Sequence, residues 1–259
     1  MTSADLTISH VRRDLALSAV VKGLLIGGAM ACVFLMPGVD ISFIITAFLV
    51  VWLMLSFKSA QGSRLLADSP TLISLGRYDE AEASLDRALH SFSIFRTVKL
   101  LSLHHLSVLR YKQRRWDEAA KLCRALLGQR LGGLVSLTKP SQLMLADSLL
   151  QLGDLHGAYQ AISRLYGYRL SLGEALQLTV LQLDYETRIA AWSSAAAGLR
   201  RKVDLCELLP ARESARAQAM MALAAKKVGQ TDWSAWLAAR VRLLGDVNEL
   251  LARQPILKE

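Results

Sequence analysis

Two long runs of apolar residues near the amino terminus form the clearest pattern in the chain. They cover residues 15–36 and 39–57, and the turn Pro37-Gly38-Val39-Asp40 lies at their junction. Lys22 and Asp40 carry the only charged side chains in this stretch. A helix needs about 20 apolar residues to cross a bilayer, so the first run is long enough and the second lies at the short end of the range. The pattern predicts a transmembrane helical hairpin over residues 15–57.

Basic residues flank this predicted hairpin. Arg12 and Arg13 precede its first helix, Lys58 and Arg64 follow its second, and the turn between the helices carries only Asp40. The positive-inside rule therefore predicts that both ends lie in the cytoplasm, with residues 1–14 as a short cytoplasmic segment and the protein integral to the inner membrane. No small-residue cleavage site separates the two runs, so we expect no removable signal peptide.

Small residues recur at every fourth position on one face of the first run. They allow close approach of another helix, which is either the second helix of the hairpin or a second copy of the chain. The hairpin carries one basic residue near a membrane face and no polar pathway, which argues against a channel or a carrier. The predicted helix-packing residues are Ala19, Gly23, Gly27 and Ala31.

A degenerate repeat runs through the rest of the chain, whose apolar positions have the period of helices and whose prolines fall between helical segments. Three copies follow one another at intervals of roughly 38 residues, and a fourth trace comes after about twice that interval, with no copy aligned near Ala191. Such a period predicts helix pairs that stack on one another. The copies are Gly76-Arg77-Tyr78-Asp79-Glu80-Ala81, Arg115-Trp116-Asp117-Glu118-Ala119, Gly153-Asp154-Leu155-His156-Gly157-Ala158 and Gly229-Gln230-Thr231-Asp232-Trp233.

These segments resemble the tetratricopeptide repeat (TPR), whose second helix commonly opens with Gly-x-aromatic-x-Glu-Ala. Leu106-Ser107 and Leu145-Ala146 stand where the family carries Leu-Gly in the preceding helix. The resemblance covers residues 65–244, although the period is longer than that of the family. It implies an all-α fold in which residues 58–259 form a TPR-like α-solenoid of four or five helix pairs, closed by a capping helix over residues 243–259.

The resemblance also implies a concave face lined by the first helix of each pair. The side chains expected there are mixed but mainly basic, so the implied partner is a protein that offers an acidic peptide, a helix or a carboxyl-terminal tail. The implied peptide-binding residues are His104, Tyr111, Lys112, Asp147, Gln151, Lys226 and Lys227.

Composition adds little chemistry to this picture. The net charge of +9 is compatible with several kinds of partner, and Cys32, Cys123 and Cys206 are too widely spaced to form a metal-binding pair. The histidines lack metal-ligand spacing, and the chain has no glycine-rich phosphate loop and no nucleophile elbow. The acidic pairs of the repeats fall in first turns of helices, where negative charge complements the dipole. We therefore expect no cofactor, no metal and no enzymatic activity.

Two basic clusters allow three interpretations. Solvated helix ends are the simplest, contact with anionic lipid headgroups is the second, and nucleic acid is the weakest because no reading helix or aromatic platform accompanies the charge. The clusters are Arg110, Lys112, Arg114 and Arg115 beside Tyr111 and Trp116, and Arg200-Arg201-Lys202.

Together these features predict a membrane-anchored scaffold or adaptor that mediates protein–protein interaction. One alternative is a structural subunit of a membrane complex assembled through the hairpin, and a second is an enzyme without a recognisable motif. The abundance of Ala, Leu and Arg indicates a bacterial source. For topology, we expect an impermeant thiol reagent to spare Cys123 and Cys206 in intact cells and to reach accessible thiols after lysis.

Overall fold

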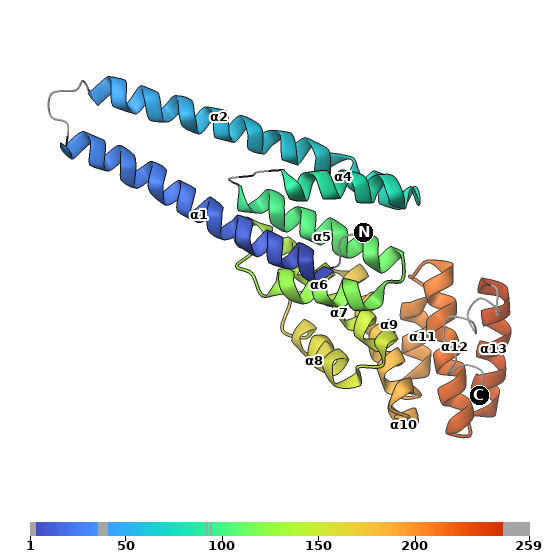
Figure 1. The fold of residues 1–259 in the computed structure, drawn as a ribbon. Helices are drawn as coiled ribbons and strands as arrows, with labels where there is room; N and C mark the ends of the chain where they lie inside the picture. Colours follow the sequence, from blue (N-terminus) through green and yellow to red (C-terminus); the bar gives the residue numbers. More distant parts are fainter. Residues whose placement is uncertain (1–3, 36–40, 92, 94, 246–259) are drawn as a thin grey trace. The chain divides into compact units, whose positions relative to one another are not determined.

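Every regular element in the described part of the chain is a helix, which confirms the prediction of an all-helical protein (Figure 1). The computed structural model describes residues 4–35, 41–91, 93 and 95–245. The predicted hairpin turn over residues 37–40 and most of the predicted capping helix over residues 243–259 lie outside the described residues. The chain divides into two compact units, Met1–Ser141 and Gln142–Glu259.

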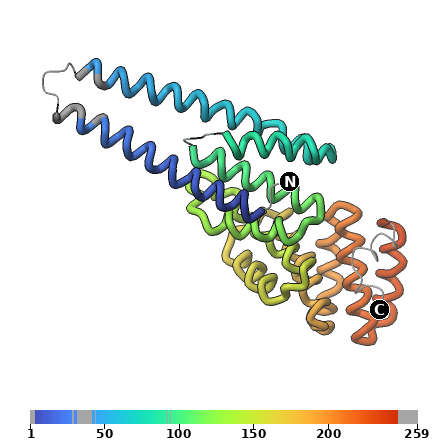
Figure 2. Tube along the Cα trace, viewed as in Figure 1, coloured from blue at the N-terminus to red at the C-terminus, as the bar shows by residue number. Residues whose placement is uncertain are grey.

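The first unit contains the two long amino-terminal helices, shorter helices that pack on them, and a 3₁₀ segment. Figures 1 and 2 show α1 and α2 side by side, extending beyond the shorter helices. The elements are α1 (Ala4–Leu35), α2 (Ile41–Ala67), α3 (Ser69–Ser74), α4 (Tyr78–His90), α5 (Arg96–Lys112), α6 (Trp116–Leu127), η1 (Gly132–Leu137) and the start of α7 (Thr138–Leu152).

Both long helices continue past the predicted hairpin into the packed part of this unit. Val11 of α1 is buried in the core that α5 and α6 share, and Leu66 of α2 is buried in the same core. A side chain at Gly62 of α2 would meet Ser91 Oγ at 2.8 Å, so glycine allows the close approach of the two segments. The predicted domain boundary at residue 58 therefore falls inside α2, and residues 4–14 form the first part of α1.

A short break separates α2 from α3, and Pro70 lies in the first turn of α3. The cap position is occupied by Asp68, whose side chain makes no capping bond. Ser69 is buried, and its Oγ donates to the Leu66 carbonyl at 2.9 Å and lies 2.7 Å from Nδ1 of His105.

The second unit is a set of helices built around α12. Its core contains Leu183, Val203, Met220 and Leu237, which come from four different helices. Ser171 and Glu174 form a capping box at the start of α9. The elements are the rest of α7, α8 (Leu155–Leu165), α9 (Leu172–Arg188), α10 (Trp192–Ala195), α11 (Leu199–Cys206), α12 (Ala211–Lys227) and α13 (Thr231–Leu244).

One turn recurs five times in the described residues with the same backbone conformation. At each turn a residue with positive φ ends one helix, and the N–H of the next residue donates to a carbonyl five positions back, as from Arg115 to Arg110 at 2.9 Å. This is the Schellman arrangement, which satisfies the last carbonyls of a helix. The residues with positive φ at these turns are evenly spaced in sequence: Gly76, Arg114, Gly153, Ala190 and Gly229.

The turn at Ala190 supplies the copy that the sequence comparison could not align. Ala191 and Trp192 follow it as Arg77 and Tyr78 follow Gly76, so the local pattern is retained although alanine replaces glycine. The second helix of this copy is broken at Gly198, whose φ of 64° separates α10 from α11. The backbone therefore repeats through both units with a period of roughly 38 residues, within the range of helical-repeat proteins.

Replacing Arg114 or Ala190 by glycine is expected to stabilise the protein by about 1 kcal/mol, because both residues hold a left-handed backbone conformation that is unfavourable for a residue with a side chain. That conformation costs such a residue roughly 1–2 kcal/mol, and glycine offsets part of this gain through its flexibility in the unfolded chain. Denaturant-induced unfolding in mild detergent measures the change. Gly153→Ala serves as the control and should lose about the same amount, whereas destabilisation by both glycine variants would contradict the assigned turns.

Candidate functional site

The three predicted peptide-binding residues of the first unit lie along α5, and each has neighbours within the unit. Nδ1 of His104 lies 3.1 Å from Oγ of Ser141, and the ring of Tyr111 packs edge-on against Trp116 at 5.2 Å between centroids. Burial, together with the charge of the adjacent His105, lowers the pKa of His104 to about 4. His104 is therefore uncharged at neutral pH, and Lys112 is the exposed cation among the three.

In the second unit, the predicted residues Asp147 and Gln151 belong to a polar network that spans three helices. Gln151 donates to Asp147 at 3.3 Å, and Arg216 of α12 contacts Asp147 at 3.3 Å and Asp184 of α9 at 2.5 Å. Arg188 also pairs with Asp184 at 2.8 Å. Two carboxylates are thus balanced by two guanidinium groups, so this network presents hydrogen-bonding groups with little net charge.

Three members of this network were not predicted from the sequence. Asp184, Arg188 and Arg216 lie outside the repeat motif that identified Asp147 and Gln151, and Arg216 is 69 residues from Asp147. The spacing of Asp184 and Arg188, four residues apart on one helix, signals an ion pair but not its partner on another helix. The two carboxylates are buried, and the arginine that joins them is partly exposed.

Lys226 and Lys227 lie at the opposite end of α12 from Arg216. Ten residues of helix separate Arg216 from Lys226, which corresponds to about 15 Å along the axis. The ammonium group of Lys227 lies 5.8 Å from the ring centroid of Trp192. The two lysines are exposed and form a basic edge that is separate from the polar network.

Two of the four basic residues in the first cluster, Arg110 and Arg115, are paired with acidic side chains. Arg110 is 2% exposed and makes a two-pronged ion pair with Glu82 of α4, with both N–O distances at 2.8 Å. Its Nε also lies 3.0 Å from Glu118 of α6, and Glu118 contacts Arg115 as well. The hydrogen bond from Arg110 lowers the pKa of Glu82, and the same pairing raises the pKa of Arg110. Arg110 therefore binds three helices together instead of offering its charge to a ligand.

The second basic cluster borders a surface hollow in the second unit. Arg200 and Arg201 line it beside Asp204 and Trp233. Lys202 points elsewhere and donates to the carbonyls of Ser194 and Ala195 at 2.8 and 3.0 Å. Burial lowers the pKa of Lys202.

The apolar part of α2 is exposed on the surface of the protein. Within the described residues, one helical stretch, Ile45–Ser74, is long and apolar enough to cross a membrane, and 11% of its apolar window is buried. Leu49, Leu53 and Phe57 are all more than half exposed. The first predicted span, residues 15–36, reaches residues outside the described set, and its insertion stays a prediction.

The small-residue stripe of α1 does not face α2 at its two glycines. A Cβ built at Gly23 or Gly27 meets nothing within 4 Å, whereas one at Gly28 would meet the ring of Phe48 at 3.6 Å. Ala19 and Ala31 are exposed as well. The structure therefore shows no packing of α2 against Gly23 or Gly27, which was one of the two interpretations of this stripe.

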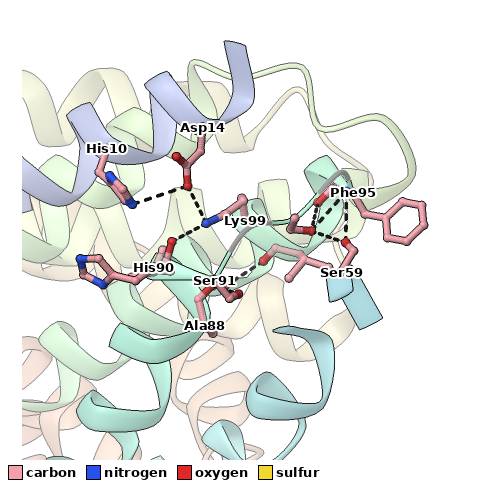
Figure 3. A network of polar contacts seen from close by, with 12 residues as sticks. His10, Asp14, Ser59, Ala88, His90, Ser91, Phe95 and Lys99 are labelled. Atoms are coloured by element: carbon pink, nitrogen blue, oxygen red, sulfur yellow. Dashed lines mark hydrogen bonds and ion pairs between the residues drawn. The ribbon is translucent and has the colours of Figure 1, made fainter. Parts of the chain in front are cut away.

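A buried ion pair fixes α1 to α5 next to the apolar part of the hairpin (Figure 3). The ammonium group of Lys99 is 1% exposed, lies 2.6 Å from Asp14 and donates to the Leu89 carbonyl. His10 lies 3.5 Å from Asp14, and its ring stacks at 5.0 Å on that of His90. The contacts join α1, α4 and α5.

The cysteines of the packed units are poor nucleophiles. Cys123 and Cys206 are buried, and burial raises the pKa of their thiols to about 12 and about 11. Because both thiols are buried, a lack of labelling in intact cells would not show on which side of the membrane they lie. The topology experiment therefore needs exposed cysteines introduced at other positions. In the described ranges, no group of three or more His, Cys, Asp or Glu side chains is arranged to hold a metal ion.

Comparisons with known protein families, with curated proteins and with solved structures find no match for this chain. The assignment of the sites described above therefore rests on the geometry of this structure.

Acidification is expected to destabilise the first unit through His104. The pKa of this histidine is about 4 in the folded chain and 6.5 as its ordinary value, so the unfolded state takes up the proton first as the pH falls below 6.5. The stabilisation is complete above that value and is lost as the pH falls toward 4. Between about pH 7 and pH 5 the loss is about 2 kcal/mol.

Urea unfolding at the two pH values measures this loss in the parent chain, in His104→Gln and in His156→Gln, which changes an exposed histidine. The His104→Gln chain should lose about 2 kcal/mol less than the parent, because glutamine takes up no proton in either state, and His156→Gln should follow the parent. Equal losses in all three chains would rule out His104 as the titrating group.

Proposed function

We propose that this protein is a membrane-anchored scaffold or adaptor, in which α1 and α2 hold the chain in a bilayer and TPR-like helix pairs bind a protein partner at the cytoplasmic face of the inner membrane. The observation that carries the proposal is the dual character of α2. One part of this helix is apolar and mostly exposed, and the other part, from Ser59 to Leu66, is packed into the first unit. A helix apolar all round needs a non-aqueous environment.

Support for the binding role comes from the recurring turn. Helix pairs that repeat with a constant turn and period resemble a TPR-like solenoid, which presents the first helices of the pairs to a partner. In the second unit, the corresponding helices α7, α9 and α12 carry the polar network of Asp147, Asp184 and Arg216. Lys112 and Lys227 add exposed positive charge on α5 and α12, which favours a partner segment with acidic residues.

A second candidate function is a structural subunit of a membrane complex. The open space beside Gly23 and Gly27 supports it, because a stripe of small residues facing outward permits close packing with a transmembrane helix from another chain or from a second copy. In that case the hairpin is the recognition element and the helix pairs provide packing surface.

Membrane insertion is tested by placing a charge in the apolar part of α2. Leu49→Arg combined with Leu53→Arg is expected to shift the protein from the alkali-resistant membrane fraction to the soluble fraction, because each arginine near the centre of a spanning helix costs about 2.5–3.5 kcal/mol. Leu75→Arg is the matched control, since Leu75 is equally exposed but lies beyond the apolar stretch. Full retention of the double variant in the membrane would refute insertion of α2.

The binding face is tested by photo-crosslinking in intact cells. A crosslinking amino acid placed at Lys112, Gln151 or Lys227 is expected to capture one common partner, and the same group at Asp79 of α4 or Ser163 of α8 should not. These control positions are exposed but belong to the second helices of their pairs. Equal capture from both sets would reject the proposed face. The same amino acid is also placed at Gly23 and Gly27, and capture confined to these two positions would favour the structural subunit.

A further inference from the structure

The end of the first unit from which the apolar part of α2 extends carries a surface that the sequence analysis did not single out. We name it the basal rim and define it as Phe95 and Arg96 at the start of α5 together with residues 128–139, which contain η1. A hydrogen bond of 2.9 Å from Arg96 to Gln129 joins the two parts. Figure 1 shows α5 beginning, and α6 ending, on the side toward which α1 and α2 extend.

Contacts with α2 place the basal rim where the apolar stretch ends. The backbone N–H of Phe95 donates to Oγ of Ser59 at 3.4 Å, and Ser59 and Ser93 share a hydrogen bond of 2.5 Å (Figure 3). Ser59 follows Lys58, which is the first charged residue after the exposed apolar residues of α2. The basal rim therefore lies beside the point on α2 where the exposed apolar part ends and the part packed in the first unit begins.

The two segments that form the basal rim carry charge of a single sign. The sequence contains no Asp or Glu between Asp86 and Asp117, and none between Glu118 and Asp147. Both parts of the rim lie within these intervals, and they carry Arg96, Arg130 and Lys139. The acidic side chains at the amino-terminal ends of α4 and α6 lie at the opposite ends of those helices.

Two exposed apolar side chains accompany the cations. Phe95 is 38% exposed, and Figure 3 shows its ring pointing away from the surrounding polar contacts. Val135 of η1 is 64% exposed. Exposed apolar side chains among basic residues are the pattern by which proteins contact the boundary between headgroups and acyl chains.

We propose that the basal rim lies in the headgroup layer of the bilayer that α1 and α2 enter, with Phe95 and Val135 inserted at the boundary and the three cations bound to anionic phospholipid headgroups. The inference rests on the membrane insertion proposed above. Lipid is the favoured occupant because the rim is continuous with α2: Ser59 follows Phe57, an exposed apolar residue, by two positions.

The same geometry separates the first basic cluster from the lipid. Phe95 lies beside Ser59, and His105 lies beside Ser69, so α5 and the α2–α3 segment run in the same direction. The 17 residues of α5 extend about 25 Å from the rim to Arg110 and Lys112. Charges at that distance lie beyond the roughly 8–10 Å over which a surface potential acts in physiological salt.

Nitroxide labels on the full chain in bilayers test the proposal. Single cysteines at Val135, Leu53 and Lys112 are introduced into a chain whose three native cysteines are replaced by alanine, and the chain is reconstituted into phosphatidylcholine with an equal amount of phosphatidylglycerol. We expect the label at 53 to collide with oxygen, the label at 112 with a water-soluble nickel complex, and the label at 135 to show the intermediate balance of the headgroup layer.

The three labels distinguish the two proposals. If positions 135 and 112 give the same aqueous signal while position 53 is in lipid, α2 is inserted and the basal rim is not docked. If position 53 is also aqueous, membrane insertion itself fails and the rim proposal fails with it.

A charge-removal experiment separates headgroup binding from simple proximity. Arg130→Gln with Lys139→Gln is expected to lower the docked-to-undocked ratio at position 135 about fivefold for each cation in bilayers that contain phosphatidylglycerol, and to change little in phosphatidylcholine alone. Lys112→Gln with Arg114→Gln is the control from the far end of α5. An equal response of the two double variants, or a response that ignores the anionic lipid, would overturn the role of the rim cations.

Discussion

The first unit depends on two long helices, each of which has an exposed apolar part and a part packed among other helices. The apolar parts of α1 and α2 have no polar face to offer water, and their remaining turns bury residues such as Val11 and Leu66 in a protein core. The buried pair of Asp14 and Lys99 stands at this transition on α1. A charge as deeply buried as that of Lys99 is costly without its partner, so the pair fixes which stretch of α1 lies against α5.

The helix pairs could be predicted from sequence wherever the turn carries its usual residues. Glycine is favoured at positive φ, and Gly76, Gly153 and Gly229 therefore mark three turns visibly. Arg115-Trp116 marks the fourth through the residues that follow the turn. The fifth was missed because Ala190 holds the left-handed conformation without glycine, and because Gly198 then breaks the second helix. What this copy shares with the others in sequence is Trp192, two residues after the turn, and Ala195, five residues after it.

The extent of the long helices was harder to predict. The buried positions in residues 4–14 include Ala4 and Thr7, which are small or polar. They form no strong apolar stripe, so the sequence does not indicate that this segment packs against other helices. In α2, the contact at Ser59 depends on a serine from a loop 34 residues away. Partners at such distances along the chain leave no periodic pattern.

The residues predicted for a binding face were chosen by their position in the repeat, which does not determine their charge in the folded chain. Arg110 and His104 belong to a basic stretch of sequence, yet one is held by Glu82 and Glu118 and the other is kept neutral by burial. Only the three-dimensional structure reveals that Arg110 and Arg115 are already paired with carboxylates and that His104 is neutral. Asp147 was predicted from its place in the repeat, but its ion pair with Arg216, on another helix, could not be predicted from the residues around it.

The continuity of α1 has a consequence for any helix that packs on its apolar part. Each residue of an α-helix turns the chain by about 100°, so the direction of every side chain in the apolar part is set by its count from Asp14. The contact between Asp14 and Lys99 lies in the packed unit, nine residues before Gly23. The direction of Gly23 and Gly27 is thus fixed by contacts in the packed part of the first unit, so a helix that packed on this stripe would be held at one rotational angle relative to that part.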